Sequence, residues 1–488
     1  MKCVSQQLMI LTAGGVADMV RPLPRSFPPG PTHDIALEMA RDPLLCFQSL
    51  KNSYGSTVGF KLATRPAVLV TSPKLVKEVL VGQSKTFVKA GTAFFPGSSL
   101  TGNGLLVSDG QVWLRQRRLA NPAFRKSVVD CYAQVMVDLT SKFLERTWHH
   151  RRCTRDVYAD FNRLTLEIVA TTLFGGYKGS HTFDEIGQAI TTAFKMFEKR
   201  GTSIFSVPEW FPTPDNLEYK SAIKKLDNVV YAVIKERRAL LLAQESEGLE
   251  RSSMESGSGL FQDLLMHLLQ GKDDDSCLGM SDVLLRDELM TLLVAGQETS
   301  AILLAWCMHM LALHPHLQEK VYMEVKDVTG NKEPSHADIR QLRLTEAFVL
   351  ETMRLMPPAY IVGRCADHST TLGRWEIPKG TTVLVGIYLL HRDPLYWSEP
   401  LRFDPSRWLK VERASRLTEM DTYWPFGGGP RTCIGMGFAM MEACLLLSTI
   451  LLRYKVSLPQ HGSSRIKPKA RITLRPEDKV ELELMMRL

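Results

Sequence analysis

The chain has 488 residues, of which 44% are apolar and 23% charged, a composition typical of a globular protein. Its formal net charge of +8 is modest for this length, and no basic motif interleaved with aromatic residues is present, so we expect no nucleic-acid partner. The nine cysteines are odd in number and form no CxxC pair. This argues against a disulfide framework or a cysteine-rich zinc site and favours a reducing, intracellular compartment.

The first 31 residues are basic, poor in acidic residues and end in a proline-rich run from Pro22 to Pro31. Their longest apolar stretch, residues 8–20, is shorter than the roughly twenty residues of a membrane-spanning helix and contains Gly14, Gly15 and Asp18. Three interpretations stay open: a targeting segment such as one for a plastid, an N-terminal segment that contacts the surface of the endoplasmic reticulum or another membrane, or a truncated membrane anchor. We assign residues 1–31 to this segment and its hinge, and residues 32–488 to one domain.

After the hinge, short β-branched runs and helical patterns alternate. Val58–Val70 predicts two short strands around a turn that contains Pro66. From Val112 the pattern is largely helical to about Gln270. Gln244–Gly259 and Lys272–Ser276 are polar and are predicted to be loops.

Three consecutive helices are predicted in the next part of the chain. Ser281 can cap a helix of about thirty residues that runs to His314–Pro315, and its apolar composition places it inside the protein. A second helix begins at about Pro315. The third extends from about His336 to Met356 and ends at the pair Pro357–Pro358.

Short strand patterns follow at Thr381–Ile387, near Arg471 and near Val480. No repeat and no long linker divides the chain. We therefore predict a mainly α (α+β) fold, a single monomeric domain with small peripheral β-sheets and a long central helix.

One cysteine has neighbours that indicate chemistry. Cys433 lies in the segment Phe426–Phe438, where three glycines and a proline make a bend that is neither helix nor strand, and an apolar helical pattern resumes from Ile434. Free N–H groups and the dipole of the following helix would favour a thiolate there. Two alternatives are a phosphate-binding turn, which lacks a GK[ST] sequence here, and an ordinary buried thiol.

The pattern Phe426-x-x-Gly429-x-Arg431-x-Cys433-x-Gly435 resembles the haem-binding loop of the cytochrome P450 family. Four more segments resemble motifs of that family and occur in its order along the chain. They are Trp113-Leu-Arg-Gln-Arg117, Ala295-Gly-Gln-Glu298-Thr299, Glu351-Thr-Met-Arg354 and Phe403-Asp-Pro-Ser-Arg407-Trp408. Ser406 departs from the glutamate that the family often has there. With the hinge, the resemblance covers nearly the whole chain.

The resemblance implies a b-type haem under the long central helix, with its iron bound by the thiolate of Cys433. The planar guanidinium group of arginine and the indole N–H of tryptophan are suitable hydrogen-bond donors to the carboxylates of the haem propionates. The implied cofactor-binding residues are Trp113, Arg117, Ala295, Gly296, Arg364, Phe426, Arg431, Cys433 and Gly435.

Glu351 and Arg354 are one helical turn apart and can pair. Taken alone, such a pair is more typical of a surface ion pair of little energetic value. The resemblance implies instead that both are buried with Arg407 and support the cysteine loop.

Thr299 and Glu298 interrupt an apolar stretch of the central helix, and buried polar groups require partners. Thr299 could simply hydrogen-bond to its own helix. The resemblance implies that the two residues relay protons to dioxygen, and that Ala295 and Gly296 leave room for it.

The resemblance further implies monooxygenation with O₂ and electrons from an NADPH-dependent reductase or a ferredoxin. Arg115, Arg118, Arg125 and Lys126 are the candidate docking face, although they could equally be solvated helix faces. The small apolar substrate is expected to be an isoprenoid, carotenoid or fatty acid. Its pocket is predicted from Phe94, Phe95, Leu292, Leu293, Ala359, Tyr360, Ile361, Val362 and Ile472.

The amino-acid sequences of the cysteine loop and of Leu390-His-Arg392 resemble those of the plant and algal carotenoid-ring hydroxylase branch of the family. Two other functions remain as alternatives: a haem-thiolate isomerase or dehydratase that acts without O₂, and a non-catalytic haem sensor. Isomerases of this type usually lack the threonine and disturb the cysteine loop, whereas Thr299 and an uninterrupted loop are present here.

Overall fold

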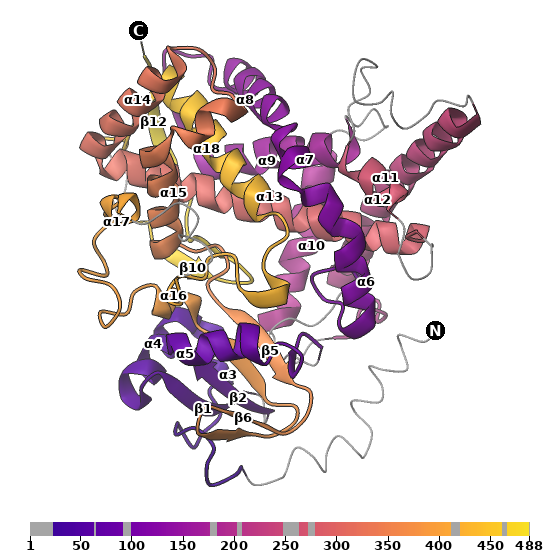
Figure 1. Ribbon diagram of the computed structural model, residues 1–488, viewed down its shortest axis with the longest axis vertical. Helices are drawn as coiled ribbons and strands as arrows, with labels where there is room; N and C mark the ends of the chain where they lie inside the picture. Colours follow the sequence, from indigo (N-terminus) through magenta and orange to yellow (C-terminus); the bar gives the residue numbers. More distant parts are fainter. Residues whose placement is uncertain are drawn as a thin grey trace.

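A computed structural model describes residues 23–62, 65–90, 99–175, 183–202, 207–246, 263–271, 279–410, 420–460 and 466–487. A helical body makes up most of the molecule, and a smaller part rich in strands lies at one end (Figure 1). The predicted mainly α fold with small peripheral sheets is therefore confirmed. Residues 1–22 of the predicted N-terminal segment 1–31, the loop at Lys272–Ser276 and the pocket residues Phe94 and Phe95 lie outside the described residues.

The longest helix of the body's interior is α13, Asp282–Leu313. It begins as predicted, with the hydroxyl of Ser281 accepting a hydrogen bond of 3.3 Å from the N–H of Leu284. At about 1.5 Å per residue its 32 residues span about 48 Å. Helix α13 and the later helix α18 are long and apolar enough to cross a membrane by length and composition, but most of each is buried inside the protein.

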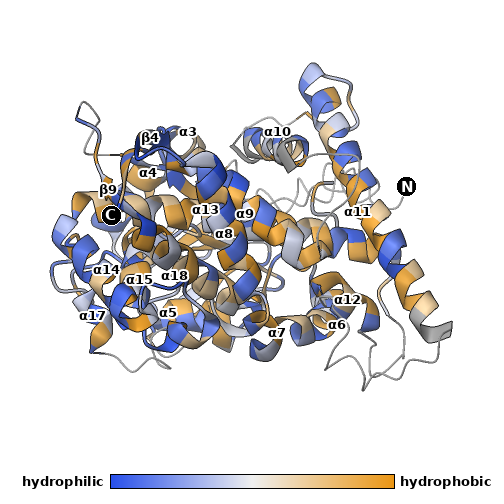
Figure 2. Cartoon of the chain, turned by 90° about the horizontal axis from the view of Figure 1, so that it is seen from above, coloured by the Kyte–Doolittle hydropathy of each residue, from blue (hydrophilic) through white to orange (hydrophobic). Residues whose placement is uncertain are grey.

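Two apolar clusters pack along α13, one on its C-terminal half (Ala301–Ala312) and the other on its N-terminal half (Leu285–Val294). One joins it to α8 (Ala133–Thr147), α15 (Arg343–Leu355) and α18 (Met436–Arg453), and the other to α9 (Val157–Phe174) and α11 (Pro214–Ser246). In Figure 2 α11 shows the alternation of hydrophobic and hydrophilic residues expected of a helix with one buried side. The other long or medium helices are α4 (Pro43–Tyr54), α6 (Gly110–Ala120), α10 (Phe183–Thr202), α12 (Leu264–Gln270) and α14 (Pro315–Thr329).

The shorter helices complete the body and its edges. They are α3 (Ala36–Arg41), α5 (Pro73–Lys77), α7 (Lys126–Asp130), α16 (Ile387–Leu390), α17 (Ser406–Leu409), the π-helix η1 (Glu78–Gly82) and the 3₁₀ helices η2 (Asn121–Phe124), η4 (His336–Arg340) and η6 (Gly429–Arg431).

Two helix predictions need correction. The predicted helix from His336 to Met356 is two elements, η4 and α15, because the Ser335–Asp338 capping box starts a short 3₁₀ turn that ends before α15 begins at Arg343. The predicted loop at Gln244–Gly259 starts too early, because α11 continues to Ser246. Residues 247–259 lie outside the described part.

A five-stranded sheet has the order β1-β2-β8-β5-β3. Its strands are β1 (Thr57–Leu62), β2 (Arg65–Val70), β8 (Thr382–Val385), β5 (Val362–Ala366) and β3 (Phe87–Val88). Pro66 lies within β2 opposite Lys61, so the prediction of a turn containing Pro66 is wrong. Proline fits there because the pairing of β2 with β8 begins only at Ala67.

Three small sheets lie at the edges of the body. In the first, β12 (Glu481–Met486) lies between β4 (Arg152–Asp156) and β9 (Tyr454–Ser457) and pairs with both. The other two pair β10 (Pro468–Ala470) with β11 (Leu474–Pro476), and β6 (Thr370–Leu372) with β7 (Trp375–Ile377). The strands near Arg471 and Val480 were predicted, whereas β4 lies inside a stretch predicted to be helical.

Candidate active site

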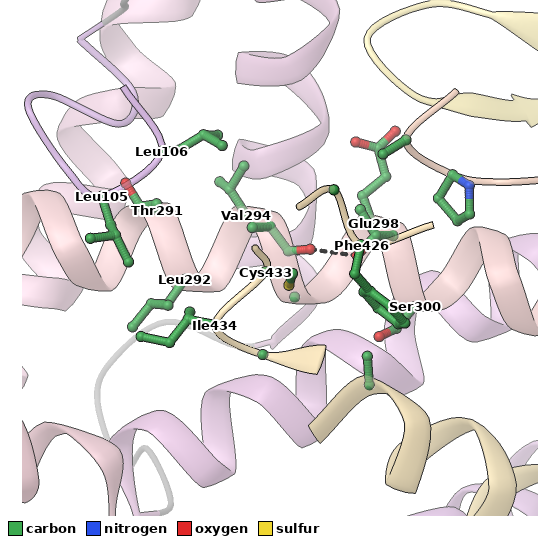
Figure 3. A pocket seen from close by; sticks show the side chains of 18 of the residues that line it. Leu105, Leu106, Thr291, Leu292, Val294, Glu298, Ser300, Phe426, Cys433 and Ile434 are labelled. Atoms are coloured by element: carbon green, nitrogen blue, oxygen red, sulfur yellow. Dashed lines mark hydrogen bonds between the residues drawn. The ribbon is translucent and has the colours of Figure 1, made fainter. Parts of the chain in front are cut away.

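A cavity of about 410 Å³ lies where α13 faces the cysteine loop. Segments far apart in the sequence enclose it: α6, α13, the cysteine loop, residues 358–364 and residues 472–473. Residues 99–108, which we call the roof segment, close one end. Figure 3 shows Leu105 and Leu106 of the roof near Thr291, with Glu298 and Phe426 at the other end and Cys433 between.

The cysteine loop is shaped by its glycines. Gly429 has a φ of +66°, and a Cβ there would lie 2.1 Å from the carbonyl oxygen of Leu80, so only glycine permits this approach to η1. The backbone N–H of Cys433 donates a 3.0 Å hydrogen bond to the carbonyl of Phe426, which closes the loop. Helix α18 then begins at Met436, close to the position expected from the sequence.

The side chain of Cys433 is accessible and lines the cavity. Burial raises the pKa of this thiol, while a hydrogen bond from the backbone of Gly435 and the charge of Arg117 act in the opposite direction. The sequence predicted that backbone N–H groups would favour the thiolate. In the structure, burial outweighs them.

Cationic side chains gather around the cavity. Arg117, Arg364 and Arg431 were predicted from the sequence, and all three contribute to the lining together with Trp113. The guanidinium of Arg431 lies 4.2 Å from the ring centroid of Trp113 and forms an ion pair with Asp109.

Lys89, at the end of β3, also lines the cavity and was missed by the sequence prediction. No motif marks it, because only the pairing of β3 with β5 places it beside Arg364. Burial, together with the charges of Arg364 and Arg431, lowers the pKa of Lys89 to about 7, and burial lowers that of Arg364 to about 10. The cationic side chains of this group outnumber the carboxylate of Asp109 that pairs with Arg431, so this part of the site has the charge to hold an anionic group.

The predicted relay residues lie on the α13 side of the cavity. Thr299 and Glu298 both line it. The hydroxyl of Thr299 donates a 2.6 Å hydrogen bond to the carbonyl of Ala295. This is the bond to its own helix that the sequence offered as the alternative to a relay. The carboxylate of Glu298 is buried and accepts a 3.1 Å hydrogen bond from the hydroxyl of Thr473.

Ala295 and Gly296 line the cavity as predicted. A Cβ on Gly296 would lie 2.9 Å from Cγ2 of Val169 in α9, so the glycine is required for helix packing. The sequence prediction explained it only by space beside a cofactor.

The predicted support group is assembled and buried. Both side chains of the Glu351–Arg354 ion pair, at 2.9 Å, are fully buried, which excludes the surface interpretation. Arg407 approaches the same carboxylate at 3.4 Å. Glu351 also accepts hydrogen bonds from the N–H of Asp404 and the indole of Trp408, and Arg354 donates to the carbonyls of His391, Pro400 and Arg402.

Most of the described residues predicted for the substrate pocket line the cavity: Leu292, Ala359, Ile361, Val362 and Ile472. Leu293 and Tyr360 do not, contrary to the prediction. Leu293 is buried against the neighbouring helices, and the hydroxyl of Tyr360 donates to the carbonyl of Arg471. The roof residues Leu100, Thr101, Leu105 and Leu106, together with Phe194, line the cavity and were not predicted.

A thiol on a glycine-shaped loop, cationic side chains and an apolar cavity fit haem b, which needs an axial thiolate and donors for two carboxylates. The site therefore defines a haem-thiolate protein. Cytochrome P450 is the family whose model matches residues 24–484.

Relatives and solved structures agree with this class. The chain is 32% identical to cyclooctat-9-en-7-ol 5-monooxygenase of Streptomyces melanosporofaciens over 85% of each chain. It is 27% identical to the chloroplastic protein LUTEIN DEFICIENT 5 of Arabidopsis thaliana, over 89% of this chain and 73% of that one. The crystal structure of the cytochrome P450DA heme domain superposes with a TM-score of 0.80 at 27% identity, covering 96% of this chain and 99% of that one.

The chain belongs to the cytochrome P450 family. It is a monooxygenase whose cofactor is haem b, and it requires O₂ and a redox partner.

Proposed function

We propose that this P450 hydroxylates an apolar isoprenoid, a carotenoid or related terpenoid, with Cys433 as the iron ligand and Thr299 and Glu298 as the proton relay. The observation that carries the assignment is that the Cys433 thiol and the Thr299 hydroxyl line one cavity, on different elements of the fold. When bound, haem b supplies the activation of O₂ by electrons delivered singly.

The polar residues then have separate roles. Trp113, Arg117, Arg364 and Arg431 hold the propionates, and we add Lys89 to this set because it lines the cavity beside Arg364 and Arg431. Phe426 and Gly435 shape the loop around the thiolate. Glu351, Arg354 and Arg407 fix the segment that precedes the loop.

The relay residues can move a proton without a large rearrangement. The hydroxyl of Thr299 donates to the carbonyl of Ala295, and its remaining lone pair can accept a proton-carrying partner in the cavity. Glu298 is held by Thr473 and can exchange a proton with the cavity, which it lines.

The substrate class is supported by the lining and by the relatives. Apart from the polar groups already assigned, the cavity is lined mainly by Leu, Ile, Val, Phe and Ala side chains. One relative is named for oxidation of cyclooctat-9-en-7-ol and another for a deficiency in lutein, a carotenoid. A fatty acid is the second candidate, because the same lining would accept an alkyl chain.

Electrons would come from an NADPH-dependent reductase or a ferredoxin that docks near α6 and η2. Arg118, Arg125 and Lys126 are exposed there and would attract an acidic partner, and Arg115 is half-buried with its guanidinium bonded to the carbonyl of Gly279. A plastid or membrane-associated location through the N-terminal segment remains part of this proposal.

The experiment is a binding screen that follows the spin-state change of the iron with carotenoids, smaller terpenes, fatty acids and sterols, followed by turnover with a reductase and NADPH. We expect a shift and an oxygenated product with terpenoids. Products formed from hydroperoxides without O₂ would support the isomerase, and binding without any turnover would support the sensor. A response to fatty acids alone would overturn the isoprenoid assignment.

A further inference from the structure

Three consecutive residues of α13 are charged and yet buried. The exposed fractions of Arg286, Asp287 and Glu288 are 6%, 9% and 1%. They precede Thr291 and Leu292, the first residues of α13 that line the cavity. Because burying a charge is costly unless it is paired, these side chains require specific partners.

The two carboxylates bind backbone N–H groups of the roof segment. Asp287 accepts a 2.8 Å hydrogen bond from the N–H of Asn103, and Glu288 accepts one of 3.1 Å from the N–H of Leu105. Burial raises the pKa of Glu288 to about 7, and the hydrogen bond from Leu105 opposes this rise. The second oxygen of Glu288 is buried and has no hydrogen-bond partner among the described residues.

The roof has little structure of its own and fits closely on α13. It consists mainly of turns, in which the N–H of Gly104 donates to the carbonyl of Thr101. Gly102 has a φ of +51°, and a Cβ there would lie 2.0 Å from a carboxylate oxygen of Asp287. A Cβ on Gly104 would lie 2.2 Å from the hydroxyl of Thr291. The roof therefore depends on α13 for its position.

Arg286 connects the roof to α11. Its guanidinium donates to the carbonyl of Ser99 at 3.0 Å and forms ion pairs with Asp227 of α11 at 2.6 Å and with Asp287 at 2.9 Å. A second link joins the same elements, since the N–H of Leu100 donates to the hydroxyl oxygen of Tyr219 in α11 at 3.1 Å. Helix α11, helix α13 and the roof are thus one hydrogen-bonded unit.

We propose that Arg286, Asp287 and Glu288 are positioning residues that fix the roof over the cavity and thereby determine which substrates are admitted. Leu100, Thr101, Leu105 and Leu106 of the roof line the cavity, so their backbone anchors set the shape of the space above the haem. A bulky ligand in the cavity would displace these lining residues, and the backbone anchors oppose that displacement. The strength of these backbone anchors therefore sets the relative affinity of the cavity for small and large ligands, and this holds for any natural substrate.

The experiment compares Glu288→Ala with Glu288→Gln in the haem-loaded full chain, and Asp282→Asn serves as the matched control. Asp282 lies on the same helix but is more than half exposed and pairs with Arg238 at the surface. Glutamine retains an acceptor oxygen for the N–H of Leu105, whereas alanine does not. Two quantities are measured: hydrogen exchange of peptides covering residues 99–108, and Kd for n-alkylimidazoles with alkyl chains of increasing length.

In Glu288→Ala we expect exchange in the roof to accelerate by roughly tenfold or more, as for loss of one hydrogen bond to a charged acceptor. The ratio of Kd values for long and short alkylimidazoles should shift toward the long ligands. Glu288→Gln should give intermediate values, and Asp282→Asn should match the parent. A role limited to stability would lower Tm without changing the ratio, and that result would overturn the proposal.

Gly104→Ala tests the packing of the roof on α13 through a second contact, should Glu288→Ala fail to fold. Its added methyl group would displace the roof from Thr291 while every charge is retained. Faster roof exchange with the same change in ligand ratio supports the proposal, and an unchanged ratio contradicts it.

Discussion

The hydroxyl of Ser300 donates a 2.5 Å hydrogen bond to the carboxyl group of Glu442 and so joins α13 to α18. Ser300 also lines the cavity, whereas Glu442 is fully buried. Burial raises the pKa of Glu442 to about 8, and the hydrogen bond from Ser300 only partly opposes it. The folded protein therefore holds a proton on this carboxyl group at neutral pH.

This raised pKa predicts a specific pH dependence of stability. The ordinary pKa of a glutamate is 4.5, so between about pH 4.5 and pH 8 the folded state binds a proton at Glu442 that the unfolded state does not. The contribution of Glu442 to the free energy of unfolding must then fall as the pH rises through this range. Glu442→Gln should flatten the decrease of Tm between pH 5 and pH 8. Glu319→Gln, at an exposed surface pair, should not, and equal slopes in both variants would refute the assignment.

Glu351 is the centre of the buried support group, and we expect Glu351→Gln to be strongly destabilising. It leaves Arg354 buried without its counter-charge, a change that costs about 3 kcal/mol or more in free energy of unfolding. Glu399→Gln is the control, because Glu399 pairs with Arg402 at the same spacing on the surface and should cost less than about 1 kcal/mol. Urea unfolding followed by circular dichroism measures both. Similar losses in the two variants would contradict the role of burial.

Lys89→Met should weaken haem retention. If Lys89 donates a charge-assisted hydrogen bond to a propionate, its loss should accelerate haem transfer to apomyoglobin by about tenfold or more. Lys85→Met removes an exposed lysine four residues earlier and should leave the transfer rate unchanged. An unaltered rate in Lys89→Met would remove this residue from the propionate site.

Thr299→Ala should separate oxygen consumption from product formation. Without the hydroxyl, proton delivery is impaired, so we expect product formation to fall by about 100-fold while NADPH and O₂ are still consumed and hydrogen peroxide accumulates. Thr172→Val is the matched control, since this threonine also lines the cavity and bonds to its own helix. Unchanged product yield per NADPH in Thr299→Ala would exclude the relay.

Cys433→Ser tests the iron ligand itself. The ferrous carbonyl complex of the parent should show the red-shifted Soret band of a thiolate ligand, and the variant should lose it. Cys444→Ser, at a buried cysteine of α18, should retain the band. Persistence of the band in Cys433→Ser would show that another residue binds the iron.

Local chemistry explains what could be predicted from the sequence. The glycine bend at Cys433, the cap at Ser281 and the turn spacing of Glu351 and Arg354 involve residues close together in the chain, whose preferences act within a few bonds. With the order of the motifs along the chain, these features were sufficient for the fold class and the family, and most of the described residues predicted for the site line the cavity. Elements were missed where local preference was weak, as for β4, and Pro66 was misplaced in a turn because proline is uncommon inside a strand, whereas here it lies in β2 opposite Lys61 of β1.

Some side chains contact each other although no sequence motif marks them, and only the tertiary structure determines these contacts. Lys89 reaches the cationic part of the cavity through the pairing of β3 with β5, and Glu442 meets Ser300 where two helices cross. The roof residues line the cavity because Asp287 and Glu288 bind their backbone N–H groups, which carry no sequence signal. The packing around Cys433 likewise raises the pKa of its thiol through burial, an effect that the glycine bend alone did not indicate.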